Sequence, residues 1–319
     1  MATKKYKSPK GKSNKAEEPL VAYRAIAKPF LKWAGGKTQL LPEIEKALPK
    51  EIYTWKSFTY IEPFAGSGAV LFWMLHKFPQ MKRVVINDIN TDLTIAYSVI
   101  KNNHELLIKK LSELQLKYRL IETEDQRREF FLQQREKFNT KELSEVENTT
   151  LLIFLNRTCF NGLYRVNASG LFNVPFGKYS NPKICDAENI RLVSEALQKV
   201  EILNTDFQQT IEKAQGNTLF YFDPPYKPLT GTSSFNAYAK ENFGDAEQER
   251  LKTFCDQLNA KKFYWILSNS DMKSNDPDNY YFDNLYQEYH IKRVLASRRI
   301  NANADKRGVL NELIITNYE

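Results

Sequence analysis

The chain contains few of the residues that build disulfide frameworks and metal centres. Its 319 residues include three cysteines and three histidines. Cys159, Cys185 and Cys255 lie far apart and form no CxxC pair, so the sequence predicts neither a zinc knuckle nor a disulfide framework. The histidines lack the spacing of metal ligands, and we therefore expect no metal site.

Long apolar runs are also missing. No segment approaches the length that a membrane-spanning helix needs, and the N-terminus has no apolar signal-peptide region. The sequence therefore predicts a protein of a reducing compartment that has no membrane partner.

Basic residues outnumber acidic ones, with 46 Lys and Arg against 38 Asp and Glu and a net charge of +8. A basic surface favours nucleic-acid partners because its binding releases counterions from phosphates, although a merely soluble basic protein has the same balance. The hydrophobic content of 42% suffices for a core, and the length allows one large domain or two ordinary ones.

The most informative segment is an apolar run that ends in the sequence DPPY at residues 223–226. Residues 218–222 predict a buried strand, and the two prolines hold the following backbone extended, with carbonyl acceptors in fixed directions. A carboxylate and a carbonyl beside an aromatic ring suit a planar base with an exocyclic amine. Asp223 and the Pro224 carbonyl would accept its two hydrogens while Tyr226 stacks on its face.

A second pattern indicates a nucleotide-binding βαβ unit. A predicted strand over 59–62 leads into the loop FAGSG at 64–68, a helical run and a second strand over 83–86. Asp88 follows that strand, about twenty residues after the loop, where a carboxylate commonly binds a ribose diol. Each feature has a structural alternative, since many strand–helix turns contain two glycines and Asp88 could cap the helix that begins near Thr91.

The chain divides into three parts on these patterns. Residues 1–25 are Lys-rich and predict a disordered arm, residues 26–97 with 186–319 predict one α/β domain, and residues 98–185 predict a mostly helical insert. Helices are expected over 39–48, 103–117, 125–138 and 146–160, a β-hairpin over 163–174, and further strands over 200–203, 263–267 and 313–316.

Six motifs in one order carry a resemblance to a known family. They are FLKWAGGK (30–37), EPFAGSGAV (62–70), NDIN (87–90), FNGLYRVN (160–167), FNVPFGKY (172–179) and FDPPY (222–226). From about residue 30 to its end, the chain resembles the DNA adenine-N6 methyltransferases of the Dam type, the alpha group or D12 class of amino-methyltransferases. The resemblance implies a Rossmann-like, S-adenosylmethionine-dependent methyltransferase sheet, with residues 98–185 as the target recognition domain.

The family implies a reaction and a set of site residues. The reaction is transfer of a methyl group from S-adenosylmethionine to N6 of a flipped-out adenine in double-stranded DNA, within GATC. Asp223, Pro224 and Tyr226 are the implied catalytic residues, and no metal takes part. The implied cofactor contacts are Trp33, Lys37, Phe64, Ala65, Gly66, Ser67, Gly68, Asp88, Asp206 and Asp223. Asp206 could instead be the N-cap of the helical run that begins near Phe207.

The insert is expected to read the DNA sequence. Lys178 stands where many members carry an arginine that reads a guanine; lysine can still donate to O6 and N7, but without the planar fork. The other candidate DNA contacts are Lys32, Tyr164, Arg165, Asn167, Asn173, Arg298 and Arg299. A structural role in the hairpin and a solvated basic loop around residues 298–299 are the alternatives.

Other functions stay open at this point. The site could be a different short adenine-containing sequence, the substrate could be RNA or a protein amide, or the chain could be an inactive DNA-binding module. The resemblance favours a monomer that acts in the cytoplasm on the nucleoid of a prokaryote, with a restriction endonuclease as a candidate partner.

Overall fold

The computed structural model describes residues 25–33, 35–227, 243–297 and 309–319. The arm predicted over residues 1–25 lies outside these ranges except for its last residue, and so do the candidate DNA contacts Arg298 and Arg299.

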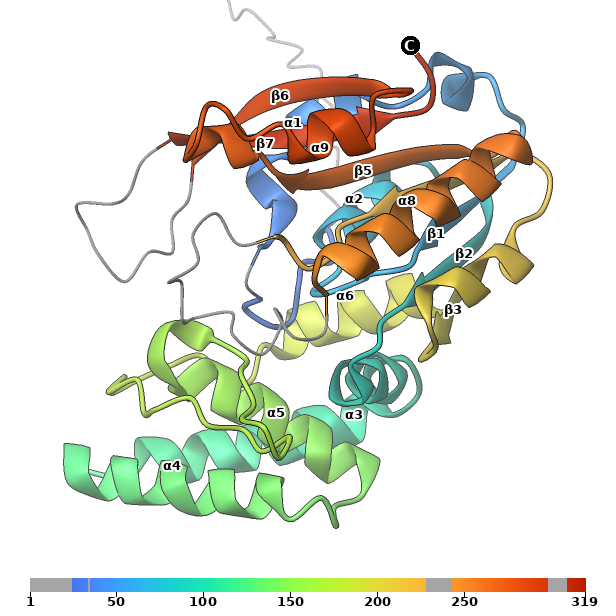
Figure 1. Cartoon of the computed structure of the whole chain (residues 1–319). Coiled ribbons are helices and arrows are strands. Elements are labelled where there is room, and N and C mark those ends of the chain that lie inside the picture. The colour runs from blue at the N-terminus through green and yellow to red at the C-terminus, as the bar shows by residue number, and fades with distance from the viewer. Residues whose placement is uncertain (1–24, 34, 228–242, 298–308) are drawn as a thin grey trace, which may run out of the picture.

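One mixed sheet organises the α/β part (Figure 1). Among the described residues it has seven strands in the order β3-β2-β1-β4-β5-β7-β6. β1 to β5 are parallel, whereas β7 lies antiparallel between β5 and β6. The strands are β1 Phe58–Glu62, β2 Met81–Asn87, β3 Val200–Leu203, β4 Thr218–Phe222, β5 Tyr264–Ser270, β6 His290–Ser297 and β7 Val309–Thr316. The predicted Rossmann-like α/β sheet is confirmed, and β6 is a strand that the sequence patterns did not predict.

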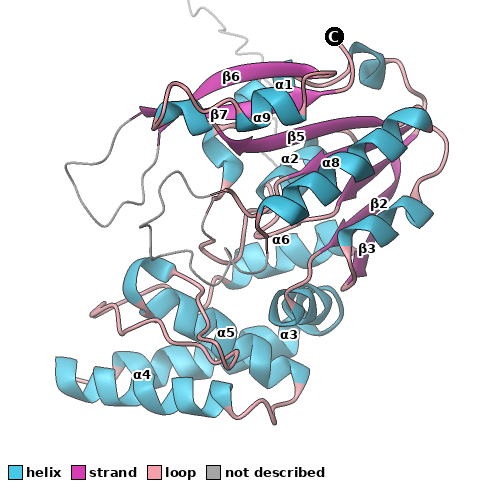
Figure 2. Ribbon diagram, viewed as in Figure 1, coloured by secondary structure: helices cyan, strands magenta, loops and turns pink. Residues whose placement is uncertain are grey.

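Helices cover both faces of this sheet (Figure 2). The strand residues alternate between two buried clusters: Tyr60 and Tyr221 pack with α1, α2, α3 and α6, whereas Ile61 and Phe222 pack with α8 and α9. All five residues of β1 and of β4 are buried, as expected for parallel strands covered on both sides. The helices are α1 Leu41–Lys46, α2 Ala69–Lys77, α3 Thr91–Arg119, α4 Glu124–Asn139, α5 Glu145–Thr158, α6 Ala187–Leu197, α8 Asp245–Ala260 and α9 Tyr281–Leu285.

Helical structure also occurs as short 3₁₀ turns, at Lys37–Gln39, Lys50–Tyr53, Phe160–Gly162, Phe207–Lys213 and Met272–Ser274. The helix predicted over 39–48 is therefore shorter than expected. Pro42 lies in the first turn of α1, where its missing N–H costs nothing, and Pro49 follows shortly after the end of the helix.

The helices α3, α4 and α5 lie together below the sheet in the view of Figure 1. α3 runs through the predicted boundary at residues 97 and 98 and leaves helical geometry at Asn103, where φ is −134° and ψ is 29°. A capping box between Thr123 and Gln126 begins α4, and the Ser144 side chain caps α5. The helices predicted over 103–117, 125–138 and 146–160 are thus present, while the domain boundaries stay a prediction.

The hairpin predicted over 163–174 forms a tight turn without extended strands. Val166 and Phe172 make an isolated antiparallel bridge, and the Asn167 N–H donates to the Leu171 carbonyl at 2.9 Å. Pro175 has no N–H with which to continue the ladder, which accounts for the short pairing.

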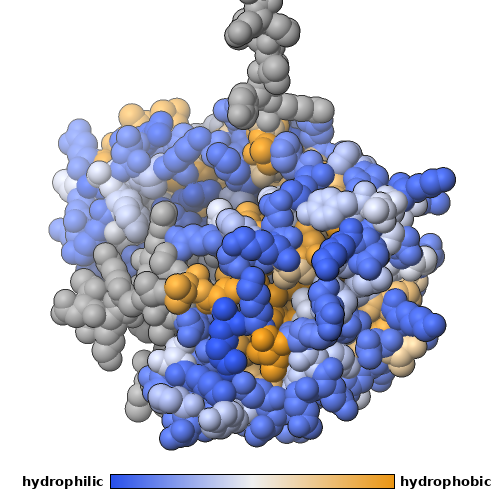
Figure 3. Space-filling view, turned by 90° about the horizontal axis from the view of Figure 1, so that it is seen from above, coloured by the Kyte–Doolittle hydropathy of each residue, from blue (hydrophilic) through white to orange (hydrophobic). Residues whose placement is uncertain are grey.

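The surface seen from above in Figure 3 is mainly hydrophilic, with apolar side chains reaching it near the middle of the face. In the described ranges, no helix has both the length and the apolar character needed to cross a membrane. No group of three or more His, Cys, Asp or Glu in those ranges could hold a metal ion.

Candidate active site at the ends of the first and fourth strands

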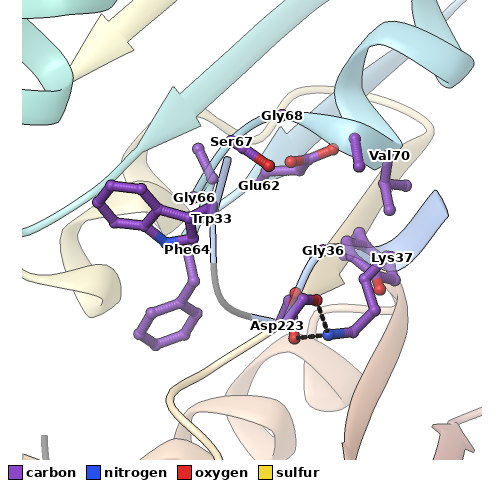
Figure 4. Close-up of a pocket in the computed structure, with 14 residues that line it drawn as sticks. Trp33, Gly36, Lys37, Glu62, Phe64, Gly66, Ser67, Gly68, Val70 and Asp223 are labelled. Carbon is purple, nitrogen blue, oxygen red and sulfur yellow. Dashed lines mark hydrogen bonds and ion pairs between the residues drawn. The ribbon is translucent and has the colours of Figure 1, made fainter. Parts of the chain in front are cut away.

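A cavity lies where β1 and β4 end (Figure 4). The order of the parallel strands reverses between these two neighbours, and open α/β sheets bind their ligands at such a switch point. Figure 4 shows the rings of Trp33 and Phe64 on one side of the cavity and the linked side chains of Lys37 and Asp223 on the other. The lining residues are Trp33, Gly35, Gly36, Lys37, Glu62, Phe64, Ala65, Gly66, Ser67, Gly68, Ala69, Val70, Tyr221 and Asp223.

The backbone of the loop after β1 lies close to the cavity, and its conformation requires glycine at two positions. Gly68 has φ +76°, and a Cβ atom there would lie 2.6 Å from the Tyr97 hydroxyl oxygen. Gly66 has φ +50°, and its carbonyl accepts a hydrogen bond from that same hydroxyl at 2.9 Å. Both conformations disfavour side chains, so the loop keeps a small profile before α2 begins at Ala69.

Asp88 fixes this loop from the end of β2. Its carboxylate accepts hydrogen bonds from the Gly66 N–H at 3.0 Å and the Asn90 N–H at 2.9 Å. Burial raises its pKa, and these two bonds oppose the rise. The N-cap of α3 is Asn90, whose side chain accepts from the Leu93 N–H, so the alternative that Asp88 caps this helix is wrong.

Lys37 joins the first motif to the DPPY segment. Its buried ammonium lies 2.8 Å from Asp223 Oδ1, donates to the Gly35 carbonyl at 2.7 Å, and lies 4.5 Å from the centre of the Tyr226 ring. Ser268 also donates to Asp223 Oδ1, at 3.5 Å. Burial raises the pKa of Asp223, and the charge of Lys37 opposes that rise.

Glu62 is a site residue that the sequence reasoning did not single out. It ends β1, lines the cavity with 2% of its surface exposed, and accepts a hydrogen bond from the Tyr60 hydroxyl at 2.5 Å. Burial raises its pKa to about 8, with the Asp223 charge adding to the rise. A carboxyl group at the end of a fully buried strand was the sequence signal for it.

The DPPY segment and the next residue, Lys227, are held in place by side chains that lie more than twenty positions further along the chain. Gln248 donates to the Pro225 carbonyl at 3.3 Å and accepts from Asn269 at 3.2 Å, and both amides are fully buried. The Ser270 hydroxyl donates to the Lys227 carbonyl at 3.0 Å. None of these residues carries a local signal, because the packing of α8 on the sheet and the position of β5 next to β4 bring them here.

The first motif also contacts the insert. The Trp33 ring stacks on Tyr164 with centroids 5.2 Å apart, and the Tyr164 hydroxyl donates to Asp92 at 2.9 Å. The buried Asn156 side chain accepts from the Lys32 N–H at 2.9 Å and donates to the Lys32 carbonyl at 2.8 Å. Lys32 itself is exposed, and its ammonium lies 5.5 Å from the Tyr179 ring.

The remaining candidate DNA contacts lie in the insert. Arg165 donates to the Asn173 side chain at 2.7 Å, and the Asn167 carboxamide accepts from the Ser169 and Leu171 N–H groups. Asn167 therefore shapes the turn. Lys178 is exposed, has φ +62°, and forms an ion pair with Glu124 at 3.0 Å.

Asp206 does not line the cavity. Its side chain accepts from the Gln208 N–H at 3.0 Å, so it is the N-cap of the 3₁₀ turn that begins at Phe207, as the structural alternative held. Its other oxygen pairs with Arg250. A contact of Asp206 with a cofactor stays a prediction.

The cavity fits a cationic nucleoside cofactor. Two carboxyl groups, Glu62 and Asp223, face a space bounded by the Trp33 and Phe64 rings and by a glycine loop. Of the predicted cofactor residues, the structure brings Trp33, Lys37, the 64–68 loop and Asp223 to one cavity, with Asp88 directly behind the loop.

Comparison with known proteins gives one family. Residues 33–300 match the sequence model of the D12 class N6 adenine-specific DNA methyltransferases. A type II methyltransferase of Methanocaldococcus jannaschii, M.MjaIII, is 47% identical over 294 residues, which cover 91% of this chain and 99% of that protein. M1.LlaDCHI of Lactococcus lactis subsp. cremoris, also a type II methyltransferase, is 38% identical over 91% of this chain and 95% of its own length. A DNA adenine methylase of Haemophilus influenzae is 34% identical over 90% and 92%.

Proposed function

This chain belongs to the D12 class of N6 adenine-specific DNA methyltransferases, and on that premise we propose that it methylates adenine within GATC after extruding the base from double-stranded DNA. It uses S-adenosylmethionine, which supplies an electrophilic sulfonium methyl group when bound. The observation that supports the proposal is the position of Asp223, which lines the cavity at the ends of β1 and β4, while Tyr226 of the same segment lies near the Lys37 ammonium.

The residues of the DPPY segment would activate the adenine amine. Its lone pair is conjugated into the ring, so the amine is a poor nucleophile. Hydrogen bonds from the amine to Asp223 and to the Pro224 carbonyl would favour a pyramidal nitrogen whose lone pair points at the cavity. Holding the amine and the methyl donor in line also accelerates the transfer, and the proton can leave afterwards.

The adenine must leave the duplex because its amino group could not otherwise reach Asp223. The amino group lies inside the stacked duplex, whereas Asp223 lies at the end of a buried strand. Tyr226 would receive the extruded base by stacking, a contact worth about 1–3 kcal/mol per base.

The insert, residues 98–185, is proposed as the target recognition domain, with residues 26–97 and 186–319 as the catalytic domain. We call residues 176–179, which include Lys178, the reading loop. The Gly177 N–H donates to the Thr158 carbonyl at 2.9 Å and so ties this loop to the end of α5. Lys32, Tyr164, Arg165, Asn167 and Asn173 are proposed to support or extend this interface. GATC is supported by the family resemblance, with Lys178 in place of the usual arginine.

We further propose a monomer, because one chain carries both the cavity and the reading loop. Two relatives are named type II methyltransferases, which supports a restriction endonuclease as a partner acting on the same site. The relative from Haemophilus influenzae is named a DNA adenine methylase.

Labelled S-adenosylmethionine with duplexes that contain GATC, a single-base variant of it or a scrambled site would test the proposal. We expect N6-methyladenine in the GATC duplex and a large preference over the other two. Equal methylation of all duplexes would contradict GATC, and methylation of RNA or a protein amide alone would replace the DNA substrate.

The assigned role of Asp223 has its own test. Asp223→Ala removes the acceptor for the amine, so we expect methyl transfer to fall at least about a hundredfold, the loss typical of removing one well-placed catalytic group. Binding of the duplex, measured by fluorescence anisotropy, should largely survive. A transfer rate equal to that of the wild type would refute the role.

A further inference from the structure

We propose that Glu312 is a positioning residue that holds the Tyr226 ring in place for the extruded adenine. The Tyr226 hydroxyl donates to Glu312 Oε2 at 2.8 Å, across 86 positions of sequence. This inference rests on the stacking role of Tyr226 in the proposed function and adds a residue from the antiparallel part of the sheet to that site.

Glu312 is a carboxylate in a strand whose following residues are buried and apolar. Ile314, two residues later, belongs to the cluster that packs under the cavity, whereas Leu313 and Ile315 face the opposite side. Strand alternation therefore puts Glu312 on the same core-facing side as Ile314, near the start of the described part of β7. A carboxylate on such a side requires a hydrogen-bond partner, and the Tyr226 hydroxyl is one.

The ring is restrained from a second direction. The Lys37 ammonium lies 4.5 Å from the ring centre, so the hydroxyl end and the ring face are both engaged. The backbone beside the ring is fixed too: Ser270, which pairs in register with Glu312, donates to the carbonyl of Lys227. β7 and β5 thus hold Tyr226 and the residue after it, Lys227.

A restrained ring lowers the cost of receiving the base. A stacking platform that already has its bound orientation loses less side-chain entropy on binding. A hydrogen bond to a charged acceptor is stronger than a neutral one, which suits a contact that must outlast the entry and exit of the base.

A double-mutant cycle tests the inference, using Glu312→Ala, Tyr226→Phe and the double variant. Tyr226→Phe keeps the ring and removes only the hydroxyl. We expect each single variant to lower kcat/KM for the duplex about tenfold, a loss typical of one hydrogen bond to a charged group. The double variant should be no slower than the slower single variant, because both substitutions remove the same contact. Losses that multiply would overturn the proposal.

Two companion variants separate positioning from general damage. Glu312→Gln keeps an oxygen acceptor and should recover most of the rate, whereas a Gln variant as slow as the Ala variant would contradict a hydrogen-bonding role. Glu288→Ala removes a carboxylate with 68% side-chain exposure and serves as the matched control, with an unchanged rate expected. Melting temperature and cofactor affinity should stay near the wild-type values in every variant.

Fluorescence of 2-aminopurine at the target position reads the same role without methyl transfer. The wild type should raise this fluorescence, and Glu312→Ala should raise it less at saturating protein. An equal rise in both proteins would overturn the inference while leaving the proposed function intact. A wild type that raises the fluorescence but methylates no duplex would instead refute the proposed function, and the difference between the two proteins would still decide the role of Glu312.

Discussion

Titratable side chains gather where β1 and β4 end, and a carboxylate of β7 lies near them. Lys37 pairs with Asp223, Glu62 lines the same cavity, and the field of Glu312 helps to raise the pKa of Asp223. The Lys37 ammonium offsets the charge of Asp223, and burial favours the protonated form of Glu62. At neutral pH the cavity therefore presents one paired carboxylate and one largely neutral carboxyl group.

The raised pKa of Glu62 predicts a pH-dependent stability. Folding takes this carboxyl from its ordinary 4.5 to about 8, so between these values the folded state holds a proton that the unfolded state has lost. Its contribution to the free energy of unfolding is therefore full below pH 4.5 and declines as the pH rises through about 8. Glu62→Gln imitates the protonated form and should be more stable than the wild type at pH 8, by on the order of 2 kcal/mol, with a smaller difference at pH 5.

Urea unfolding of both proteins at pH 5 and pH 8 would measure this effect. The exposed Glu288→Gln supplies a control, for which the difference from the wild type should not change with pH. Parallel pH profiles for Glu62→Gln and the wild type would show that Glu62 is ionised in the folded protein.

At the scale of elements, short connections hold the proposed reading loop, residues 176–179, to the end of α5. Phe176 forms an antiparallel bridge with Cys159, and the Gly177 N–H donates to the Thr158 carbonyl at the end of α5. Asn156, near the same helix end, donates to the carbonyl of Lys32 in the first motif. One helix end therefore connects the reading loop with the segment that lines the cavity. This arrangement places the proposed base reader and the proposed chemistry on a common support.

The contact between this loop and the end of α5 has no room for a side chain at Gly177. A Cβ atom there would lie 2.4 Å from the Cys159 carbonyl oxygen and 2.6 Å from the Tyr179 ring. Gly177→Ala should therefore shift the loop that carries Lys178 and cost about 1–3 kcal/mol of stability, the usual range for overpacking. We expect slower DNA methylation with cofactor affinity preserved, measured by steady-state kinetics and titration calorimetry.

Gly170, in the hairpin that precedes this loop, provides the matched control. It has φ +73° and open space where a Cβ would stand, and asparagine tolerates such a conformation better than other residues. Gly170→Asn should leave the rate of methylation close to that of the wild type. If both variants were equally impaired, the packing of Gly177 against Cys159 would not be the reason.

At the scale of the whole molecule, the net charge of +8 predicts binding to DNA that weakens with salt. Each phosphate contact that is lost should reduce the slope of log affinity against log salt by about 0.9. Lys32 is exposed beside the insert, and we expect Lys32→Ala to lower the slope by one such contact. Lys292 of β6, whose ammonium pairs with Glu43 of α1, supplies the control.

Fluorescence anisotropy with a GATC duplex over a series of KCl concentrations would give these slopes. An unchanged slope for Lys32→Ala, or an equal reduction for Lys292→Ala, would remove Lys32 from the phosphate interface.

The sequence by itself determined the parts of this protein that are local. The strand before Asp223, the glycine loop after β1 and the insert helices follow from apolar periodicity, small residues and caps within a few positions, and the structure has each of them. The family also followed from the order of motifs along the chain, because that order is a property of sequence alone.

Only the tertiary structure decided which distant residues complete the site. Gln248 reaches the DPPY segment because α8 packs against the sheet, and Glu312 reaches it because β7 follows β5, the neighbour of β4. No residue near either of them in the sequence indicates these contacts. The cap of α3 was likewise decided by geometry: Asp88 turns to the Gly66 loop, which leaves Asn90 to begin the helix. Pairing between strands depends on topology, and topology is fixed by how the whole core packs rather than by any local pattern.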